Sequence, residues 1–305
     1  MRRSPHRVVD RAERALIAVQ LALNALALGM AYALVALGFV LALNAVGAVN
    51  FAHGDLVVLG GAVAVLLGTR LGLPAALLLP AVALALGAAG IVAARVAILP
   101  LAARPPEATF VATIALAAII EHGLTLTMGG QPRTAPALAG SGTFEVMGLA
   151  IGRQPLAIIL VGGIVVGGVW LLLERTQIGR RMRAVASDRQ MSRAVGIPVG
   201  RYVTLSLALS GALAGIAGLL LGHQFLVSPT QGAGDMLKAY IAVAIGGWGS
   251  VPGALVGALA IGAFETFVSA ALGDAWASAA LYVSVLLVLA VRPQGLFGEP
   301  VGRRA

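Results

Sequence analysis

The sequence contains no cysteine, and Lys238 is its one lysine among 305 residues. The absence of cysteine excludes disulfides, thiolate metal sites and a cysteine nucleophile. Lys238 follows Met236 and Leu237, so no G-x-x-x-x-G-K-[ST] phosphate loop can form around it. The chain therefore cannot hold the phosphates of ATP in that manner.

Catalytic and metal-binding patterns are also missing. Neither a G-x-S-x-G nucleophile motif nor an H-E-x-x-H zinc motif occurs. The four histidines are scattered without metal-ligand spacing: His6, His53, His122 and His223. We therefore predict that the chain is not an enzyme and carries no metal or cofactor of its own.

Charged residues are scarce, at 11% of the chain, whereas 59% is hydrophobic and the mean hydropathy is +0.97. Soluble domains contain about 25% charged residues, so a soluble enzyme, a disordered chain and a nucleic-acid-binding module are excluded. The net charge of +9 comes almost wholly from arginines. Most of them lie at the ends of apolar runs, which is typical of charges that set membrane topology. The composition predicts an all-α polytopic membrane protein surrounded by lipid, with no nucleic-acid partner.

Apolar runs of about 20 residues, the length of a membrane helix, recur along the chain. We predict one membrane-spanning domain over 1–305, with a basic N-terminal segment at 1–15 and about eight embedded helices. Their approximate ranges are 16–43, 55–69, 74–99, 108–128, 155–173, 202–227, 253–273 and 276–291. A shorter apolar piece at 237–247 is too short to cross alone, which favours a re-entrant or half-helix there.

The distribution of arginine predicts the orientation. The loop at 174–201 carries seven arginines and the loop at 129–154 carries two, so the first should be cytoplasmic and the second external. The turn at 95–104 should also be cytoplasmic. Three predicted membrane crossings precede this turn, which places the basic N-terminus outside unless the long first apolar run holds two segments or lies partly flat. Both alternatives stay open.

Polar residues at membrane depth are costly and are functional candidates by default. Asn50, His53 and Asp55 lie around the first break between apolar runs, and Glu265 falls inside a late one. Gly54-Asp55 and Gly234-Asp235 each stand just before a short apolar stretch. Broken helices at corresponding places in two halves of a transporter point to a transport site.

The basic loop contains the pattern of a short capped helix. Ser187 is placed to cap a helix from Asp188 to Val195, and Gly196 is placed to end it. Met191, Ala194 and Val195 share one face at helical spacing. We interpret this helix as a docking element for a partner protein, or alternatively as a helix that lies on the bilayer surface.

Four blocks of sequence stand out in order along the chain: Asn50-Phe51-Ala52-His53-Gly54-Asp55, the loop at 179–197, the G-G-W-G-S-V-P-G stretch at 246–253 and the R-P-Q-G-L-F-G tail at 292–298. In sequence and in order, these blocks resemble permeases of bacterial branched-chain amino-acid ABC importers, within which the chain is more similar to the LivH-type subunit than to the LivM-type subunit. The sequence departs from the family pattern at Asp55, where Glu is usual, and at Glu121-His122, where Gln-Asn is expected.

The resemblance implies a type II ABC importer permease fold in a bacterial inner membrane. It implies a second homologous permease subunit of the LivM type, two separate ATPase subunits that hold ATP and magnesium, and an extracytoplasmic binding protein. It further implies ATP-driven alternating access for branched-chain amino acids. Urea and short-amide importers share this architecture, so that substrate class stays an alternative. An ion-coupled secondary transporter is the alternative from another class, for which only Glu265 is well placed.

The sequence thus nominates two groups of functional residues. The translocation-path group is Asn50, His53, Gly54, Asp55 and Glu265. The ATPase-coupling group is Ser187, Asp188, Arg189, Met191, Arg193 and Gly196.

Overall fold

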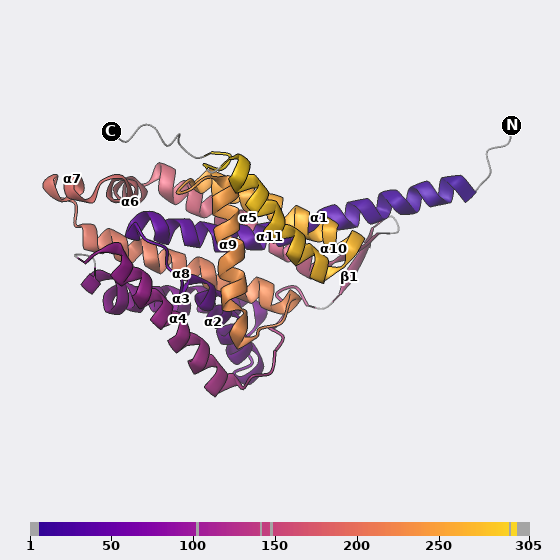
Figure 1. Ribbon diagram of the computed structural model, residues 1–305. Helices are drawn as coiled ribbons and strands as arrows, with labels where there is room; N and C mark the ends of the chain where they lie inside the picture. The colour runs from indigo at the N-terminus through magenta and orange to yellow at the C-terminus, as the bar shows by residue number, and fades with distance from the viewer. Residues whose placement is uncertain (1–5, 102–103, 141, 147–148, 293, 298–305) are drawn as a thin grey trace.

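One long helix, α1 (His6–Val46), runs through the bundle in the computed structural model (Figure 1). The structure describes residues 6–101, 104–140, 142–146, 149–292 and 294–297, and the side chains of 6–15 are not described. The side chains of the predicted basic segment 1–15, and positions 293 and 298 of the C-terminal motif, therefore lie outside the described residues. The most apolar portion of α1 is almost entirely buried by the rest of the bundle, whereas Ile17, Val19 and Leu26 nearer its start are exposed.

Eight helical stretches within the described residues are long and apolar enough to cross a membrane, which confirms the predicted number. They are Leu16–Val46 of α1, α2 (His53–Val65) with the π-helical η1 (Leu66–Arg70), α3 (Ala75–Ala93) with η2 (Ala94–Ile98) and η3 (Leu99–Leu101), α4 (Pro106–Met128), α5 (Arg153–Arg175), α8 (Val199–Gln224), α10 (Val251–Leu272) and α11 (Asp274–Val291).

The remaining elements lie between these helices. Two short helices, α6 (Gln177–Ser187) and α7 (Arg189–Ala194), follow α5. An antiparallel hairpin of β1 (Thr143–Val146) and β2 (Leu149–Gly152) precedes α5, with Thr143 opposite Gly152. A 3₁₀ turn, η4 (Pro229–Gln231), leads into α9 (Gly232–Gly246). Figure 1 places α7 and the hairpin at opposite ends of the bundle, which we call the α7 end and the hairpin end.

The predicted short apolar piece is α9, a helix of 15 residues. At 1.5 Å per residue it is about 22 Å long, which is less than the roughly 30 Å of a bilayer core. In Figure 1 it crosses α1 steeply. This part of the chain is therefore a short interior helix, in agreement with the prediction.

The first apolar run forms one continuous helix, so the expectation that it could hold two segments is wrong. The sequence of the run contains no proline, and its glycines, Gly29 and Gly38, are accommodated inside the helix. The helix therefore passes through the bundle once. Its first turns lie at the hairpin end, and its last turn lies at the α7 end, where the carbonyl oxygen of Ala45 contacts Arg189 of α7.

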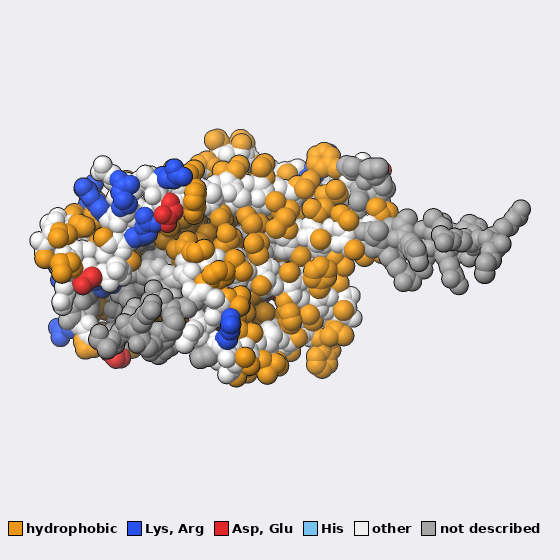
Figure 2. Space-filling model, turned by 90° about the horizontal axis from the view of Figure 1, so that it is seen from above, with side chains coloured by type: hydrophobic (Ala, Val, Ile, Leu, Met, Phe, Trp, Pro, Cys, Tyr) orange, Lys and Arg blue, Asp and Glu red, His pale blue; other side chains and the backbone are white. Residues whose placement is uncertain are grey.

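Arginine side chains gather on the surface at the α7 end, and hydrophobic side chains cover most of the rest of the face in Figure 2. Exposed leucine, isoleucine and valine side chains from α3, α4, α5, α10 and α11 form the outer surface of the bundle. Exposed apolar surface of this kind suits contact with lipid rather than water.

Glycines allow the interior helices to touch through their backbones. A Cβ on Gly218 of α8 would overlap the carbonyl oxygen of Val57 in α2, and one on Gly257 of α10 would overlap that of Ala242 in α9. Gly163 and Gly167 of α5 have the four-residue spacing that favours such close packing, but among the described residues a Cβ at either position has no neighbouring atom within 4 Å.

This difference predicts opposite outcomes for two alanine substitutions. Gly218→Ala should destabilise the protein by about 1–3 kcal/mol, because the added methyl group forces α2 and α8 apart. Gly167→Ala on the open face of α5 should leave stability unchanged or raise it slightly, since alanine favours helix. The thermal unfolding midpoint in detergent measures both. Equal midpoints for the two variants would contradict the close contact of α2 and α8.

Candidate functional site

Helix α2 begins deep inside the bundle, where His53 joins it to two other helices. The ring atom Nε2 of His53 donates to the carbonyl oxygen of Val35 in α1 at 2.9 Å. This bond assigns the proton to Nε2, so Nδ1 accepts from the hydroxyl of Ser210 in α8 at 3.3 Å. Val35 and Ser210 lie in the middle portions of their spans, Leu16–Val46 and Val199–Gln224. His53 is wholly buried and marks a helix start near mid-depth.

The segment 47–52 returns the chain from the α7 end to this depth. Val46 lies eleven residues beyond Val35 on α1, or about 16 Å along a helix. Within the segment, Asn50 Oδ1 accepts from the backbone N–H of Ala52 at 3.2 Å, and the N–H of Phe51 donates to the hydroxyl of Thr113 in α4 at 3.2 Å. These side chains supply the partners that irregular backbone needs where water is absent.

Helix α9 begins against the start of α2. A Cβ on Gly54 would overlap the carbonyl oxygen of Gly232, and a Cβ on Gly232 would overlap the carboxylate of Asp55. Asp55 and Asp235 lie in the first turns of the two helices, where the helix dipole favours negative charge. The two Gly-Asp pairs noted in the sequence therefore both belong to short interior helices that meet at their N-termini.

His53 and Gly54 join α2 to neighbouring helices, and Asn50 accepts a local hydrogen bond in the turn before α2. All three are buried, and Asp55 is 6% exposed. Sequence reasoning missed Thr113 and Ser210, because a hydroxyl inside an apolar helix carries no signal until its partner is known. That these residues also border a translocation path stays a prediction.

Glu265 belongs to a polar cluster that the sequence did not suggest. Its Oε1 accepts from Lys238 Nζ at 2.7 Å, and its Oε2 accepts from the hydroxyl of Tyr32 at 2.8 Å. Lys238 also donates to the Tyr32 hydroxyl at 2.6 Å. The three side chains form a triangle that connects α1, α9 and α10. The sequence feature that could have pointed to this cluster is Lys238, the single lysine of the chain, near the start of the apolar run at 237–247.

A cavity of about 500 Å³ surrounds this triangle. Polar side chains contribute much of its wall, and Leu28, Leu221, Phe225 and Ala277 contribute an apolar portion. The side chains of Lys238 and Glu265 are 20% and 13% exposed, so both can be reached from the cavity. The wall continues to the end of α8 and the start of α11, at the hairpin end.

The predicted docking helix is present as α7, and its cap differs from the prediction. The carboxylate of Asp188 accepts from the N–H groups of Gln190 at 2.8 Å and Met191 at 2.9 Å. Ser187, predicted as the cap, is instead the last residue of α6. The chain becomes extended only at Asp188, whose φ is −152°, and a capping residue needs that backbone. Gly196 ends the helix at φ +79°, as predicted.

The outer face of α7 is apolar and exposed. Met191 is 62% exposed and Val195 is 67% exposed, and Arg193 is also exposed. Arg189 points the other way, and its guanidinium donates to the carbonyl oxygen of Ala45 in the last turn of α1. Burial, with a smaller effect from the charge of Arg193, lowers the pKa of Arg189 from its ordinary value. Arg189 therefore connects α7 to the helix end from which segment 47–52 departs.

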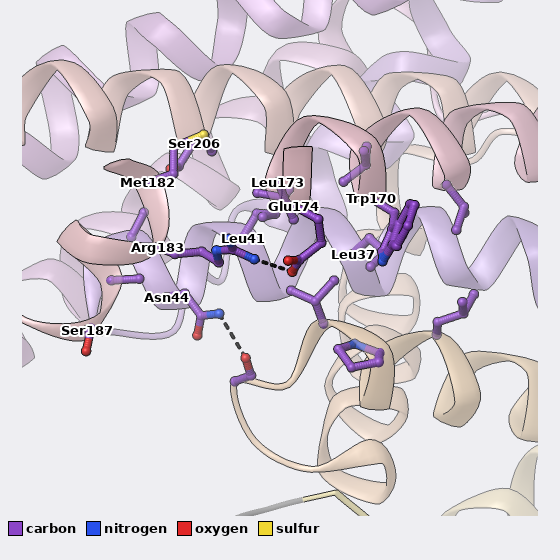
Figure 3. A pocket seen from close by; sticks show the side chains of 18 residues that line it. Leu37, Leu41, Asn44, Trp170, Leu173, Glu174, Met182, Arg183, Ser187 and Ser206 are labelled. Atoms are coloured by element: carbon purple, nitrogen blue, oxygen red, sulfur yellow. Dashed lines mark hydrogen bonds and ion pairs between the residues drawn. The ribbon is translucent and has the colours of Figure 1, made fainter. Parts of the chain in front are cut away.

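A second cavity, of about 830 Å³, lies beside α6 between α1, α5 and α10 (Figure 3). Leu37, Leu41, Trp170 and Leu173 give it a mainly apolar wall, and Met182 of α6 projects toward it. The sequence did not suggest this cavity, whose wall combines separate helices. Because α6 forms part of the wall, a shift of α6 and α7 changes the shape of the cavity.

Figure 3 shows two polar contacts at the margin of this cavity. Arg183 of α6 forms an ion pair with Glu174 at the end of α5. Asn44 Nδ2 donates to the carbonyl oxygen of Gly249 at 2.9 Å, which fixes the turn between α9 and α10 to the end of α1. The α7 end of the bundle is thus held together by side chains from α1, α5 and α6.

Eight stretches of the described chain that are long and apolar enough to cross a membrane, interior helices that begin near mid-depth and an exposed capped helix at one end are typical of a multi-pass membrane transport protein. A model of the family described as "Branched-chain amino acid transport system / permease component" matches residues 21–291. The chain belongs to this family of permease components. No solved structure matches the chain.

Two curated relatives align with nearly the whole chain, and a third aligns with 70% of it. It is 30% identical to the high-affinity branched-chain amino acid transport system permease protein BraD of Pseudomonas aeruginosa, over 92% of this chain and 96% of BraD. It is 29% identical to LivH of Escherichia coli K12, over 94% of this chain and 98% of LivH. It is also 30% identical to the ribose import permease protein RbsC of Escherichia coli K12, over 70% of this chain and 67% of RbsC.

The cap of α7 leads to a prediction that separates neighbouring residues. Asp188→Ala should destabilise α7 by about 0.5–2 kcal/mol, because two N–H groups lose their acceptor. Ser187→Ala should have little effect on α7, and Asp188→Asn should retain most of the cap. Hydrogen exchange at the amides of residues 190 and 191 measures the loss. Faster exchange of these amides in Ser187→Ala than in Asp188→Ala would mean that Ser187, and not Asp188, caps the helix.

Proposed function

We propose that this chain is the translocation subunit of an ATP-driven importer of branched-chain, hydrophobic amino acids in a bacterial inner membrane. It would work with a second homologous permease of the LivM type, two ATPase subunits that bind ATP and magnesium, and an extracytoplasmic binding protein. Family membership and the nearly full-length similarity to BraD and LivH carry this proposal. The lack of a phosphate loop in the sequence is consistent with ATP hydrolysis on separate subunits.

The alternatives have less support. An ion-coupled secondary transporter would use Glu265 as its coupling acid, yet this carboxylate already pairs with Lys238 and Tyr32. Urea and short amides are the alternative substrates, and the transport experiment described below tests urea against leucine. The similarity to a ribose permease gives a reason to test substrates, since related permeases act on different molecules.

We place the coupling to ATP hydrolysis at α7. Its exposed apolar side chains, Met191 and Val195, would insert into a groove of an ATPase subunit, and Arg193 would meet acidic groups there. Arg189 would then transmit the movement to Ala45 and on to segment 47–52. The translocation path would run beside the start of α2, bordered by Asn50, His53, Gly54 and Asp55, with Glu265 nearby.

Reconstitution of the complete transporter in proteoliposomes tests the proposal. Uptake of radiolabelled leucine should require ATP and the binding protein, and urea should be neither transported nor competitive. The permease alone should hydrolyse no ATP. Uphill uptake driven by an ion gradient without ATP would overturn the proposal, and uptake of urea instead of leucine would replace its substrate.

One substitution in the same assay tests the coupling role. Met191→Asp would place an unpaired charge in the apolar contact, so leucine uptake and ATPase stimulation should fall together by about tenfold or more. Gln190→Asp adds the same charge one residue away and is the matched control. Permease abundance in the membrane should be equal in both variants. Wild-type uptake by Met191→Asp would mean that α7 is not the coupling element.

A further inference from the structure

We propose that the cavity around Lys238 and Glu265 binds the charged head group of a zwitterionic amino acid within the permease itself. Lys238 would bind the α-carboxylate, and Glu265 would bind the α-ammonium group. This site rests on the proposed function and names the residues that recognise the substrate class. It lies apart from the exposed coupling helix.

The first support is the match between an opposite-charge pair and a zwitterion. Lys238 Nζ and Glu265 Oε1 are 2.7 Å apart. An amino acid likewise carries its ammonium and carboxylate groups close together, because both are bonded to the same carbon. Such a ligand can exchange the protein ion pair for two new ones without leaving a charge unpaired. Burying an unpaired charge would be costly, so this exchange favours zwitterions over neutral molecules such as urea.

Tyr32 prepares the pair for such an exchange. Its hydroxyl accepts from Lys238 at 2.6 Å and donates to Glu265 at 2.8 Å, so it contacts both charged groups at once. Lys238 also lies over the Tyr32 ring, with Nζ 4.9 Å from the ring centre. When a ligand separates the two charges, Tyr32 can stay bonded to each of them. Tyr32 therefore gives each charged group a hydrogen-bond partner both before and after the exchange.

The cavity wall also suits an aliphatic side chain. Leu28, Leu221 and Ala277 line it, and Phe225 presents a ring that is 42% exposed and lies 5.8 Å from Lys238 Nζ. The volume of about 500 Å³ falls in the range of small-molecule sites, about 300–1,000 Å³. The polar side chains that make up much of the wall would orient the charged head group, and this apolar portion would receive the aliphatic side chain.

The position of the pair argues against a purely structural role. Lys238 and Glu265 are partly exposed to the cavity, so a small ligand inside it can reach both charged groups. Ionisable residues within membrane segments commonly mark substrate pathways. Tyr32 is less than one helical turn from Val35, the residue bonded to His53, so the cavity reaches the depth where α2 begins.

Protection of a cysteine from chemical modification tests the site directly, because the natural chain contains none. Ser278→Cys places a thiol on the cavity wall. In the reconstituted transporter without ATP or binding protein, excess L-leucine should slow its reaction with a cationic methanethiosulfonate reagent by about tenfold. Thr230→Cys lies on the exposed η4 turn outside the lining and should react equally with and without leucine.

Leucine analogues and a second substitution complete the experiment. Leucinamide lacks the carboxylate, 4-methylpentanoate lacks the ammonium group and urea lacks both charges, so none should protect the thiol of the Ser278→Cys variant. When Lys238→Met is added to Ser278→Cys, the thiol should still react and leucine should no longer protect it. Lys238→Met with Glu265→Gln removes both charges, which would rescue a merely structural pair but should not restore protection.

The outcomes separate this site from the proposed function. Protection by leucine that is lost in Lys238→Met supports the site. No protection in a transporter that still imports leucine with ATP would overturn the site and leave the proposed function standing. Equal protection by leucinamide, or protection restored in the doubly neutral variant, would also overturn the role of the charged pair.

Discussion

The structure depends on one constraint, which is that backbone polar groups at membrane depth must find partners within the protein. Segment 47–52 and the start of α2 meet it with His53, Asn50 and Thr113. The chain that returns from α8 toward α9 meets it through backbone bonds between Val227 and Arg133, at 2.7 and 3.0 Å. Both short interior helices can begin inside the bundle only because these partners exist.

The same constraint connects the two ends of the molecule. Arg189 of α7 binds Ala45 at the end of α1, and the chain then passes directly into segment 47–52 and α2. Gly54 places α2 in backbone contact with the start of α9, and α9 carries Lys238. A movement of α7 thus has a continuous set of packed contacts toward the polar cavity. These contacts are the physical connection through which the proposed coupling would act.

The sequence predicted the architecture well, because long apolar runs between breakers determine membrane spans directly. It located all eight spans and the short helix α9, and its prediction of α7 was correct within one residue at each end. It misplaced the cap at Ser187, since a serine and an aspartate in succession are equally good candidates until the backbone is known. It could not find the Tyr32–Lys238–Glu265 triangle, because three residues from different helices share no local pattern.

The glycine pattern shows the same limit. Gly163 and Gly167 have the same spacing as Gly218 and Gly222, yet only the second pair packs against other described residues, chiefly of α2 and the loop after α8. Spacing identifies a face that permits close approach, and the fold decides whether another helix occupies it. Likewise, His53 could be nominated as a polar residue at depth, whereas its two partners came only with the structure.

The contact between the starts of α2 and α9 is the central claim, and disulfide formation tests it most directly. A Cβ on Gly54 would lie 2.7 Å from that of Met236 and would also overlap the carbonyl oxygen of Gly232, so the two helix starts must separate slightly. That separation brings the two Cβ atoms toward the roughly 3.5–4.5 Å that a disulfide needs. Gly54→Cys with Met236→Cys should therefore crosslink under mild oxidation in the membrane, as detected by mass spectrometry of the joined peptides. Gly54→Cys with Tyr240→Cys, one turn further along α9, should not. Crosslinking of neither pair, or of both equally, in normally inserted protein would contradict the account.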